Sequence, residues 1–370
     1  MSEQLDTVAG SGGPARPVSP AAGGALARPG RGRWWREDAS EPVRRNLGLV
    51  GVLVVLYLIG AFARPDIFVH PGRLWSNELT VLTQAASIGV ITVGMTFVMI
   101  SGGIDLSVGA LLALASVWST TVATQSYGPG VMILAALLVG AIAGLVNGVL
   151  IAYGRMVPFI ATLATMVAAR GVAQKISGKL TQIVKVNGIN RIAETKILGI
   201  PLLVLIFAAV AVAGWVLLNR TTFGRRTVAI GGNPEAARLA GINIRRTQLA
   251  LYALSGLCCG IGAVMVTSLA NAGSSDHGNL YELQAIAAAI IGGTSLSGGR
   301  GTIVGSVLGV LVFTQINNLF IVNNLQLEYQ LIAQGAIIVG AVLVQQFRPA
   351  ALRRSTPGSA ALPRSAPGGG

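Results

Sequence analysis

Ten long apolar stretches determine what this chain can fold into. A bilayer-spanning helix needs about 20 apolar residues, and backbone polar groups in hydrocarbon must be satisfied inside a helix or a closed barrel. The chain is therefore predicted to be an all-α polytopic membrane protein with about ten transmembrane helices. The eighth stretch is short and is expected to be re-entrant or tilted beside polar protein. The stretches cover residues 47–63, 81–100, 106–123, 131–153, 156–173, 198–218, 249–270, 283–296, 302–322 and 331–346.

Composition supports the same fold class. Of the 370 residues, 52% are hydrophobic and 11% are charged, whereas a soluble domain has about 25% charged residues. The 49 glycines suit closely packed membrane helices, because small residues let backbones approach. The net charge of +14 does not indicate a nucleic-acid partner. Most arginines lie beside apolar stretches, where positive-inside sorting and anionic membrane lipids explain them.

The apolar stretches divide the chain into three regions. Residues 1–45 and 348–370 are rich in Gly, Ala, Pro, Ser and Arg, and both are expected to be disordered tails. Residues 46–347 form the predicted transmembrane domain. No cleavable signal peptide is expected, because no apolar core follows a short charged start. The basic, Trp-containing end of the first tail, Arg31 to Arg36, is expected to lie on lipid head groups.

The charges between the stretches predict an orientation. If the N-terminus is cytosolic, the inside segments carry 18 lysines and arginines and the outside segments carry seven. Basic loops are retained in the cytosol, so ten crossings would place both termini there. Residues 175–196 are the weak point, because this orientation puts a basic stretch outside.

The longest polar interruption, residues 219–248, is predicted to be a cytosolic loop with its own short helix. It holds six arginines and one acid, Glu235. Asn233 is a suitable N-cap, Pro234 suits the first helical position, and Gly241 suits the position past the end. A helix this small and polar buries little by itself. It is expected either to lie against the membrane surface or to fit a groove in a cytosolic partner.

Asp105 is the residue most indicative of function, since it lies where the second and third stretches meet. A carboxylate at membrane depth is costly and usually faces a cavity or a partner. Two roles stay open. Asp105 could cap the helix that starts at Leu106, or it could take part in solute passage, together with the hydroxyls of Ser101 and Ser107.

Other polar side chains complete the candidate translocation pathway: Gln284, Thr294, Asn317 and Asn318. The amides could hydrogen-bond a polar solute such as a sugar, or they could simply join helices. Arg170, near the end of the fifth stretch, is expected to snorkel to the outer face.

Two glycine patterns predict how the helices are arranged. Residues 102–109 (GGIDLSVG) and 292–299 (GGTSLSGG) share a pattern and indicate a two-half internal repeat with broken helices, as in many transporters. Glycines at 140, 144 and 148, and at 301, 305 and 309, form rows of small residues. Such rows predict tight helix crossings, within one subunit or between two.

The chain lacks the sequence patterns of an ATPase and of other common enzymes. A phosphate-binding loop reads Gly-x4-Gly-Lys-(Ser/Thr). The nearest approach, Gly178-Lys179, is followed by Leu180 and has Ala173 in place of the first glycine. No nucleophile elbow, zinc-ligand spacing or paired carboxylates are found. We therefore expect no enzyme, no catalytic residue and no cofactor.

The cysteines and histidines do not indicate a metal site. Cys258 and Cys259 are adjacent within an apolar stretch and are expected to be packing residues. His70 and His277 are far apart and have no ligand spacing around them.

Several stretches, in order, resemble the ribose-type monosaccharide permeases, which are membrane subunits of bacterial ABC importers. The resemblance covers residues 47–346. Its motifs are VGMT at 93–96, SGGIDLSVG at 101–109, FIATL at 159–163, GGN at 231–233 through GIN at 241–243, and YEL at 281–283 through GGTSL at 292–296. The family commonly has Asp where this chain has Gln284. If that position contacts solute, the preferred sugar differs from ribose.

The resemblance implies a permease in the bacterial cytoplasmic (inner) membrane, paired with a second copy or a close paralogue. It implies two other partners: a cytosolic ABC ATPase, which binds ATP and Mg²⁺, and a periplasmic or lipid-anchored sugar-binding protein. The Glu-Ala-Ala-x3-Gly element at 235–241 resembles the coupling helix that docks on the ATPase, which favours the partner over the membrane surface. Its coupling residues would be Glu235, Ala236, Ala237, Arg238 and Gly241.

Alternative functions stay open. The first is an ABC permease for another small polar solute, such as a nucleoside, a polyol or a branched-chain amino acid, although the SGGIDLS stretch favours the sugar branch. The second is a stand-alone ion-coupled transporter. It needs intramembrane ionisable groups, and only Asp105 and Arg170 qualify. A membrane enzyme is the third.

Overall fold

The structure, a computed structural model, describes residues 34–353. The chain divides into two units, residues 1–40 and 41–370. In the first unit only the beginning of helix α1 is described. The second unit contains every other described element. Most of both predicted tails, residues 1–33 and 354–370, lies outside the described residues.

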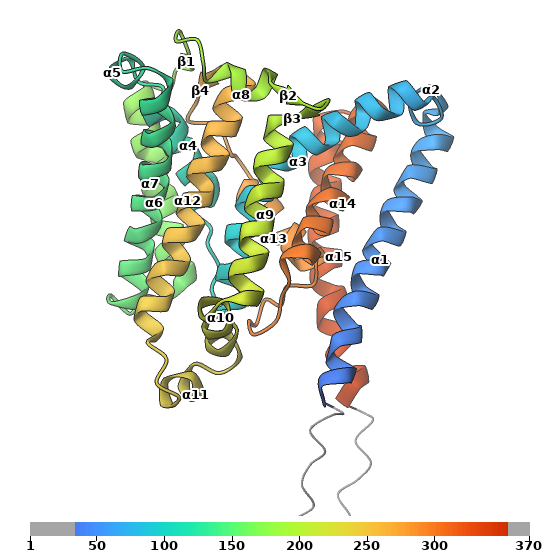
Figure 1. The fold of residues 1–370 in the computed structure, drawn as a ribbon, viewed down its shortest axis with the longest axis vertical. Helices are drawn as coiled ribbons and strands as arrows, with labels where there is room; N and C mark the ends of the chain where they lie inside the picture. Colours follow the sequence, from blue (N-terminus) through green and yellow to red (C-terminus); the bar gives the residue numbers. More distant parts are fainter. Residues whose placement is uncertain (1–33, 354–370) are drawn as a thin grey trace, which may run out of the picture. The chain divides into compact units, whose positions relative to one another are not determined.

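Within the described residues, the chain is almost entirely helical (Figure 1). The long helices are α1 (Trp34–Ala63), α3 (Pro71–Ile100), α6 (Pro129–Ala152), α7 (Pro158–Ser177), α9 (Leu202–Arg220), α12 (Ile244–Ala270), α14 (Ile303–Val322) and α15 (Leu327–Arg353). The shorter ones are α2 (Pro65–Phe68), α4 (Val108–Ser119), α5 (Val122–Gln125), α8 (Asn190–Glu194), α10 (Thr222–Gly232), α11 (Pro234–Leu239) and α13 (Tyr281–Ile291). Two antiparallel pairs join β1 (Gln182–Ile183) to β4 (Ala272–Gly273) and β2 (Lys196–Ile197) to β3 (Ile200–Pro201).

Six helices of the described range are long and apolar enough to cross a membrane: Val43–Ala63 of α1, α3, α6, α9, α12 and α14. This confirms the all-α polytopic fold class. Helices α4 and α13 have 12 and 11 residues, well below the about 20 that a crossing needs. The short α13 agrees with the short eighth stretch. The third stretch was expected to be helical from 106 to 123, but α4 covers only its centre.

Two helices extend into regions that composition assigns to the tails. Helix α1 begins at Trp34 and α15 ends at Arg353, so residues 34–45 and 348–353 are helical. Lengthening an existing helix is much easier than nucleating a new one. The neighbouring apolar stretches supply the nucleus.

The glycine rows pack helices together inside one chain. A Cβ atom on Gly140 of α6 would lie 2.4 Å from the carbonyl oxygen of Gly256 in α12. A Cβ on Gly309 of α14 would lie 2.0 Å from the carbonyl oxygen of Ala288 in α13. The backbones are therefore in direct contact, as small residues permit. The tight crossings are confirmed, and they lie within one subunit.

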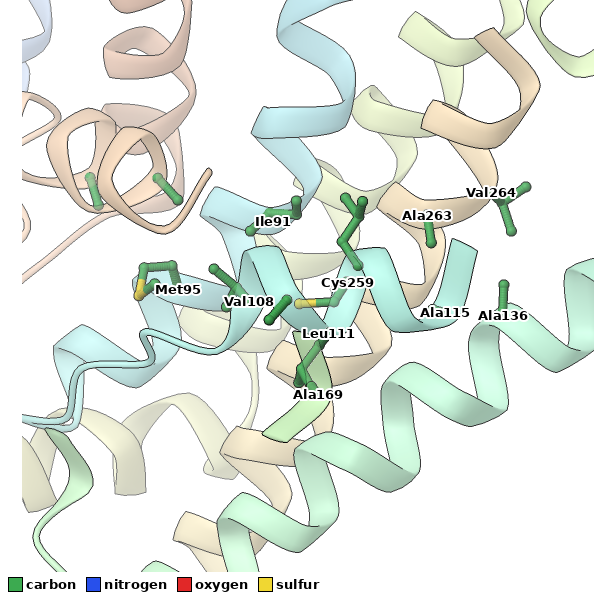
Figure 2. Close-up of a cluster of buried hydrophobic side chains, with 14 of the residues drawn as sticks. Ile91, Met95, Val108, Leu111, Ala115, Ala136, Ala169, Cys259, Ala263 and Val264 are labelled. Carbon is green, nitrogen blue, oxygen red and sulfur yellow. The ribbon is translucent and has the colours of Figure 1, made fainter. Parts of the chain in front are cut away.

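A hydrophobic cluster surrounds the half-length helix α4 (Figure 2). Long helices on several sides of α4 contribute to it, so protein replaces lipid around a helix that is too short to cross. Both cysteines are buried and free, and Cys259 belongs to this cluster, which confirms its packing role. The labelled members are Val108, Leu111 and Ala115 of α4, Ile91 and Met95 of α3, Ala136 of α6, Ala169 of α7, and Cys259, Ala263 and Val264 of α12.

The connecting elements of the second unit gather at two opposite ends (Figure 1). Helices α10 and α11 lie at one end, and α8 with the four strands lies at the other. The basic stretch 175–196 is part of the second end. There Val184 and Ile189 pack on Met132, and Ser268 Oγ donates to the carbonyl oxygen of Ile189 at 2.6 Å. This stretch is thus an ordered cap over the helix ends.

Candidate functional site

Helix α11 has the boundaries that the polar loop predicts. Asn233 is its N-cap, and its Oδ1 accepts a hydrogen bond from the backbone N–H of Ala236 at 3.0 Å. Pro234 is the first helical residue. Gly241 has a φ of 80°, a left-handed conformation that glycine adopts without steric cost. Local sequence alone therefore specifies this helix.

The surface of α11 offers both charge and apolar area to a partner. Arg238 Nη2 and Glu235 Oε1 lie 2.5 Å apart, and this hydrogen bond raises the pKa of Arg238, which keeps its charge. Leu239 is 77% exposed. Burial of this large apolar side chain against a partner would be favourable. Ala237, in contrast, is buried within the chain.

The end of α10 touches two turns of the helical domain, at glycines that are partly buried or exposed. A Cβ on Gly231 would lie 1.8 Å from the carbonyl oxygen of Ile100 and 2.6 Å from the backbone nitrogen of Gly299. Gly299 N–H donates to that same carbonyl at 2.8 Å. A Cβ on Gly298 would lie 2.9 Å from the Cα of Gly102. We call these four glycines, 102, 231, 298 and 299, the glycine junction.

The glycine junction joins the two stretches that share the Gly-Gly pattern. The first follows α3 and precedes the short α4, and the second follows the short α13 and precedes α14. Since α10 leads directly into α11, a displacement of α11 would act on both turns at once.

Asp105 lies in a fully buried polar network. Its Oδ1 accepts from the backbone N–H of Ser107 at 3.0 Å and from Ser107 Oγ at 2.5 Å. Its Oδ2 accepts from Ser255 Oγ of α12 at 2.8 Å, and Asn147 Nδ2 of α6 donates to Ser107 Oγ at 2.8 Å. All four side chains are 0% exposed. The network ties the turn before α4 to two long helices.

The structure shows the backbone contact expected of a cap at Asp105, because its carboxylate accepts the free N–H of Ser107 just before the helix, but the helix begins later than expected. Helix α4 starts at Val108 with Ser107 in the N-cap position, not at Leu106. The carboxylate binds the backbone two residues on, in an Asx-type turn that competes with helix. Asp105 therefore holds a non-helical segment in place.

Gln284 and Asn317 line one pocket. It has a volume of about 470 Å³ and lies among α3, α12, α13, α14 and α15. Gln284 Oε1 is buried, and in the part of the chain that the structure describes it has no hydrogen-bond partner. Asn317 Oδ1 accepts from Gln334 Nε2 at 3.2 Å.

The other candidate pathway residues do not line this pocket. Ser101 Oγ donates to the carbonyl oxygen of Val98 at 2.7 Å. Thr294 is buried at the α13–α14 turn, with its Oγ1 3.4 Å from Ser306 Oγ. Asn318 Nδ2 donates to Asn77 Oδ1 of α3 at 3.1 Å, so this amide joins two helices. The candidates are therefore distributed over two turns, a helix contact and a pocket.

Arg170 is partly buried and binds backbone carbonyl groups of the protein. Its guanidinium donates to the backbone carbonyl oxygens of Ser275 and His277, and it holds the loop between β4 and α13. The guanidinium has five N–H donors, and one of its nitrogens, Nη1, makes both of these bonds.

Three amide residues of the pocket were missed from the sequence: Gln84, Gln330 and Gln334. Gln84 interrupts the second apolar stretch, and an intramembrane amide is a usable signal. Gln330 and Gln334 are four residues apart, so they share a helix face. Within the described ranges, no group of three or more His, Cys, Asp or Glu could hold a metal ion.

The chain is similar to known transport proteins along most of its length. Residues 77–342 match the model of the family described as branched-chain amino acid transport system / permease component. The ribose import permease protein of Bacillus subtilis strain 168 is 40% identical over 84% of this chain and 95% of its own length. The galactofuranose transporter permease protein of Escherichia coli K12 is 35% identical over 84% and 94% of the two chains.

A third relative is the galactose/methyl galactoside import permease protein of Escherichia coli K12, 34% identical over 81% of this chain and 94% of its own. No solved structure matches the chain.

Proposed function

Because this chain belongs to the family of branched-chain amino acid transport system permease components, we propose that it is the transmembrane permease subunit of a bacterial ABC importer for a monosaccharide. The observation that carries this function is 40% identity over 95% of a ribose import permease. The other relatives reported above are named for galactofuranose and galactose. Sugar is therefore favoured over an amino acid, even though the family description names amino acids.

The chain lies in the bacterial inner membrane and crosses it several times. Six apolar helices of the described range support the crossings, and the relatives are import permeases. We further propose ten transmembrane segments with both termini cytosolic, in which the short helices α4 and α13 cross as broken segments together with the turns beside them. In support, Arg45 of α1 lies at the α13–α14 turn, on the side of the second unit that carries α11, because its Nη1 donates to the carbonyl oxygen of Gly293.

The domain limits belong to the same proposal: a transmembrane domain over 46–347, a coupling loop over 219–248 and two tails. The two-half repeat is also part of this proposal. The contact between the two Gly-Gly turns favours it. The reversed order of long and short helices around these turns speaks against a simple duplication.

The energy for transport comes from a separate ATPase. A chain without a phosphate-binding loop has to receive ATP-driven motion through contact, and we propose α11 as the contact. Glu235, Ala236 and Arg238 are exposed there, beside Leu239. Closure of the ATPase dimer would move α11, and the glycine junction would transmit that motion to the turns beside α4 and α13.

Solute would be delivered from outside by a sugar-binding protein and would pass between alternating outward-facing and inward-facing states. A second permease copy completes the proposed assembly. The proposed pathway residues stay Ser101, Asp105, Ser107, Gln284, Thr294, Asn317 and Asn318. Asp105, Ser107 and Thr294 are fully buried, so they would shape the turns, whereas Gln284 and Asn317, which line the pocket, would meet solute.

Reconstitution tests this function. The permease would be purified with the ATPase and the binding protein encoded beside it, and ATP hydrolysis and uptake of labelled D-ribose and D-galactose would be measured in liposomes. A stable complex whose ATP hydrolysis and uptake rise with one sugar is expected. A permease that purifies alone and moves solute under an ion gradient would replace this function with an ion-coupled one.

A further inference from the structure

We propose that the pocket beside Gln284 is a solute-binding site of the permease itself, and that it selects an uncharged, polyhydroxylated solute. This inference rests on the proposed function, since it concerns the solute of that importer. The site, here called the amide pocket, is defined by five primary amides: Gln84 of α3, Gln284 of α13, Asn317 of α14, and Gln330 and Gln334 of α15.

Among the residues that the structure describes, no charged side chain lines the amide pocket. Taking a phosphate or carboxylate out of water is costly unless a cation compensates it, and this lining offers none. A neutral solute avoids that cost. Each amide provides two N–H donors and one carbonyl acceptor, and a sugar hydroxyl both donates and accepts. The lining therefore matches hydroxyl groups and disfavours anions.

Part of the hydrogen-bonding capacity of the pocket is left for a ligand. Gln284 Oε1 is buried without a partner in the described chain, although buried polar atoms are almost always hydrogen-bonded. The bond from Gln334 Nε2 to Asn317 Oδ1 leaves Asn317 Nδ2 and Gln334 Oε1 to offer to a solute. Gln330 Nε2 donates to the carbonyl oxygen of Leu325 at 2.9 Å, which leaves its Oε1.

The rest of the lining suits the apolar faces of a sugar ring. Ile88, Leu269 and Ile321 bring aliphatic groups to the same pocket, and Tyr281 brings an aromatic ring. The volume of about 470 Å³ lies within the range of about 300–1,000 Å³ for small-molecule sites. An apolar surface with a few placed polar groups is the usual composition of such sites.

The position of the pocket fits delivery from outside. Leu269 and Ala270 form the end of α12 next to β4, at the end of the second unit opposite α11 (Figure 1). Solute released by a binding protein would meet the amide pocket before the glycine junction. The permease would then add a selection step to that of the binding protein.

Two variants and one control test the pocket in the reconstituted complex. Gln284→Leu and Gln334→Leu remove an amide at nearly constant side-chain size. Gln326→Leu is the control, because Gln326 is exposed and does not line the pocket. For whichever of D-ribose and D-galactose the wild type imports, the initial uptake rate is measured for the sugar and for each of its single-deoxy analogues, with saturating binding protein.

A lost hydrogen bond in a buried polar site changes the rate by about tenfold or more. We expect Gln284→Leu and Gln334→Leu to import the parent sugar about tenfold more slowly. At least one deoxy analogue that the wild type disfavours should be imported by a pocket variant at the parent's rate. Co-purification with the ATPase should match the wild type, and the Gln326→Leu variant should keep both rate and preference.

Two results would overturn the amide pocket: wild-type rates and preferences in both pocket variants, or an equal loss in Gln326→Leu. A uniform loss for all analogues, with unchanged ratios, would also overturn it, because a merely structural role moves rates but not preferences. If instead the wild-type complex imports neither sugar, the proposed function fails, and the amide pocket that rests on it fails with it.

Discussion

At the scale of single residues, the buried carboxylate of Asp105 is surrounded by several hydrogen-bond donors. Asp105 accepts three hydrogen bonds within the described structure, two from Ser107 and one from Ser255. Such a network rigidifies a non-helical turn inside a membrane domain, where lipid could not satisfy the backbone. The same network explains why the turn sequence SGGIDLS needs both its acid and its second serine, Ser107.

Replacing Asp105 should therefore destabilise the protein more than replacing one of its donors. Asp105→Ala leaves several buried donors unpaired, at about 1–3 kcal/mol each. Ser255→Ala removes a single hydrogen bond, worth about 1 kcal/mol. Thermal unfolding of the detergent-solubilised protein should give a clearly lower midpoint for Asp105→Ala than for Ser255→Ala. Equal midpoints would contradict the network as a structural element.

The glycine junction predicts a sharp difference between two neighbouring residues. A Cβ on Gly231 would lie 1.8 Å from the carbonyl oxygen of Ile100, whereas a Cβ on Gly232 meets nothing within 4 Å. Gly231→Ala should thus displace α10 from both turns, at a cost of about 1–3 kcal/mol for overpacking. Sugar uptake should fall strongly in Gly231→Ala and stay at the wild-type level in Gly232→Ala. Similar uptake in the two variants would argue against transmission through this junction.

At the scale of elements, α11 is a helix that local sequence specifies and that tertiary packing barely supports. Its cap, its proline and its glycine are in the expected positions, but only Ala237 is buried among its residues. An element with so little burial of its own is suited to gain its contacts from another chain.

Charge reversal on α11 should uncouple transport without unfolding the permease. Glu235 is exposed, and its pair with Arg238 is a surface ion pair of small energetic value. In Glu235→Lys, membrane insertion and melting should match the wild type, while co-purification with the ATPase and sugar uptake should fall. Glu194→Lys makes the same change on exposed α8 at the opposite end and should have no effect. Normal sugar uptake by Glu235→Lys would contradict the docking of α11 on the ATPase.

At the scale of the whole molecule, the orientation of the chain in the membrane can be measured by replacing each of two exposed leucines with cysteine. Leu239 follows the coupling residues of α11, and Leu198 lies between β2 and β3; they are 77% and 98% exposed. The native cysteines are buried and should not react. In intact cells, a membrane-impermeant thiol reagent should label Leu198→Cys and leave Leu239→Cys unlabelled until the membrane is opened. Labelling of Leu239→Cys from outside would reverse the proposed topology.

Much of the architecture could be predicted because it depends on local patterns. Each of the ten apolar stretches contains or overlaps a helix. The glycine rows at 140–148 and 301–309 predicted close crossings that α6 with α12, and α14 with α13, indeed form. Helix length was less predictable. The third stretch is apolar over a full crossing, yet α4 stops after 12 residues, because side-chain and turn hydrogen bonds outcompete helix on both sides of it.

The functional residues also differ in whether local sequence or tertiary packing determines them. The coupling helix was predictable, since caps and helix formers act within a few residues of one another. The amide pocket was not, because its residues come from α3, α13, α14 and α15, and only the packing of those helices brings Gln84 and Gln334 beside Gln284. The sequence by itself determined a helical membrane protein, its coupling loop and its family. The tertiary structure alone decided which polar side chains share a cavity and which are buried in the turns, because contacts between distant residues depend on how the helices pack.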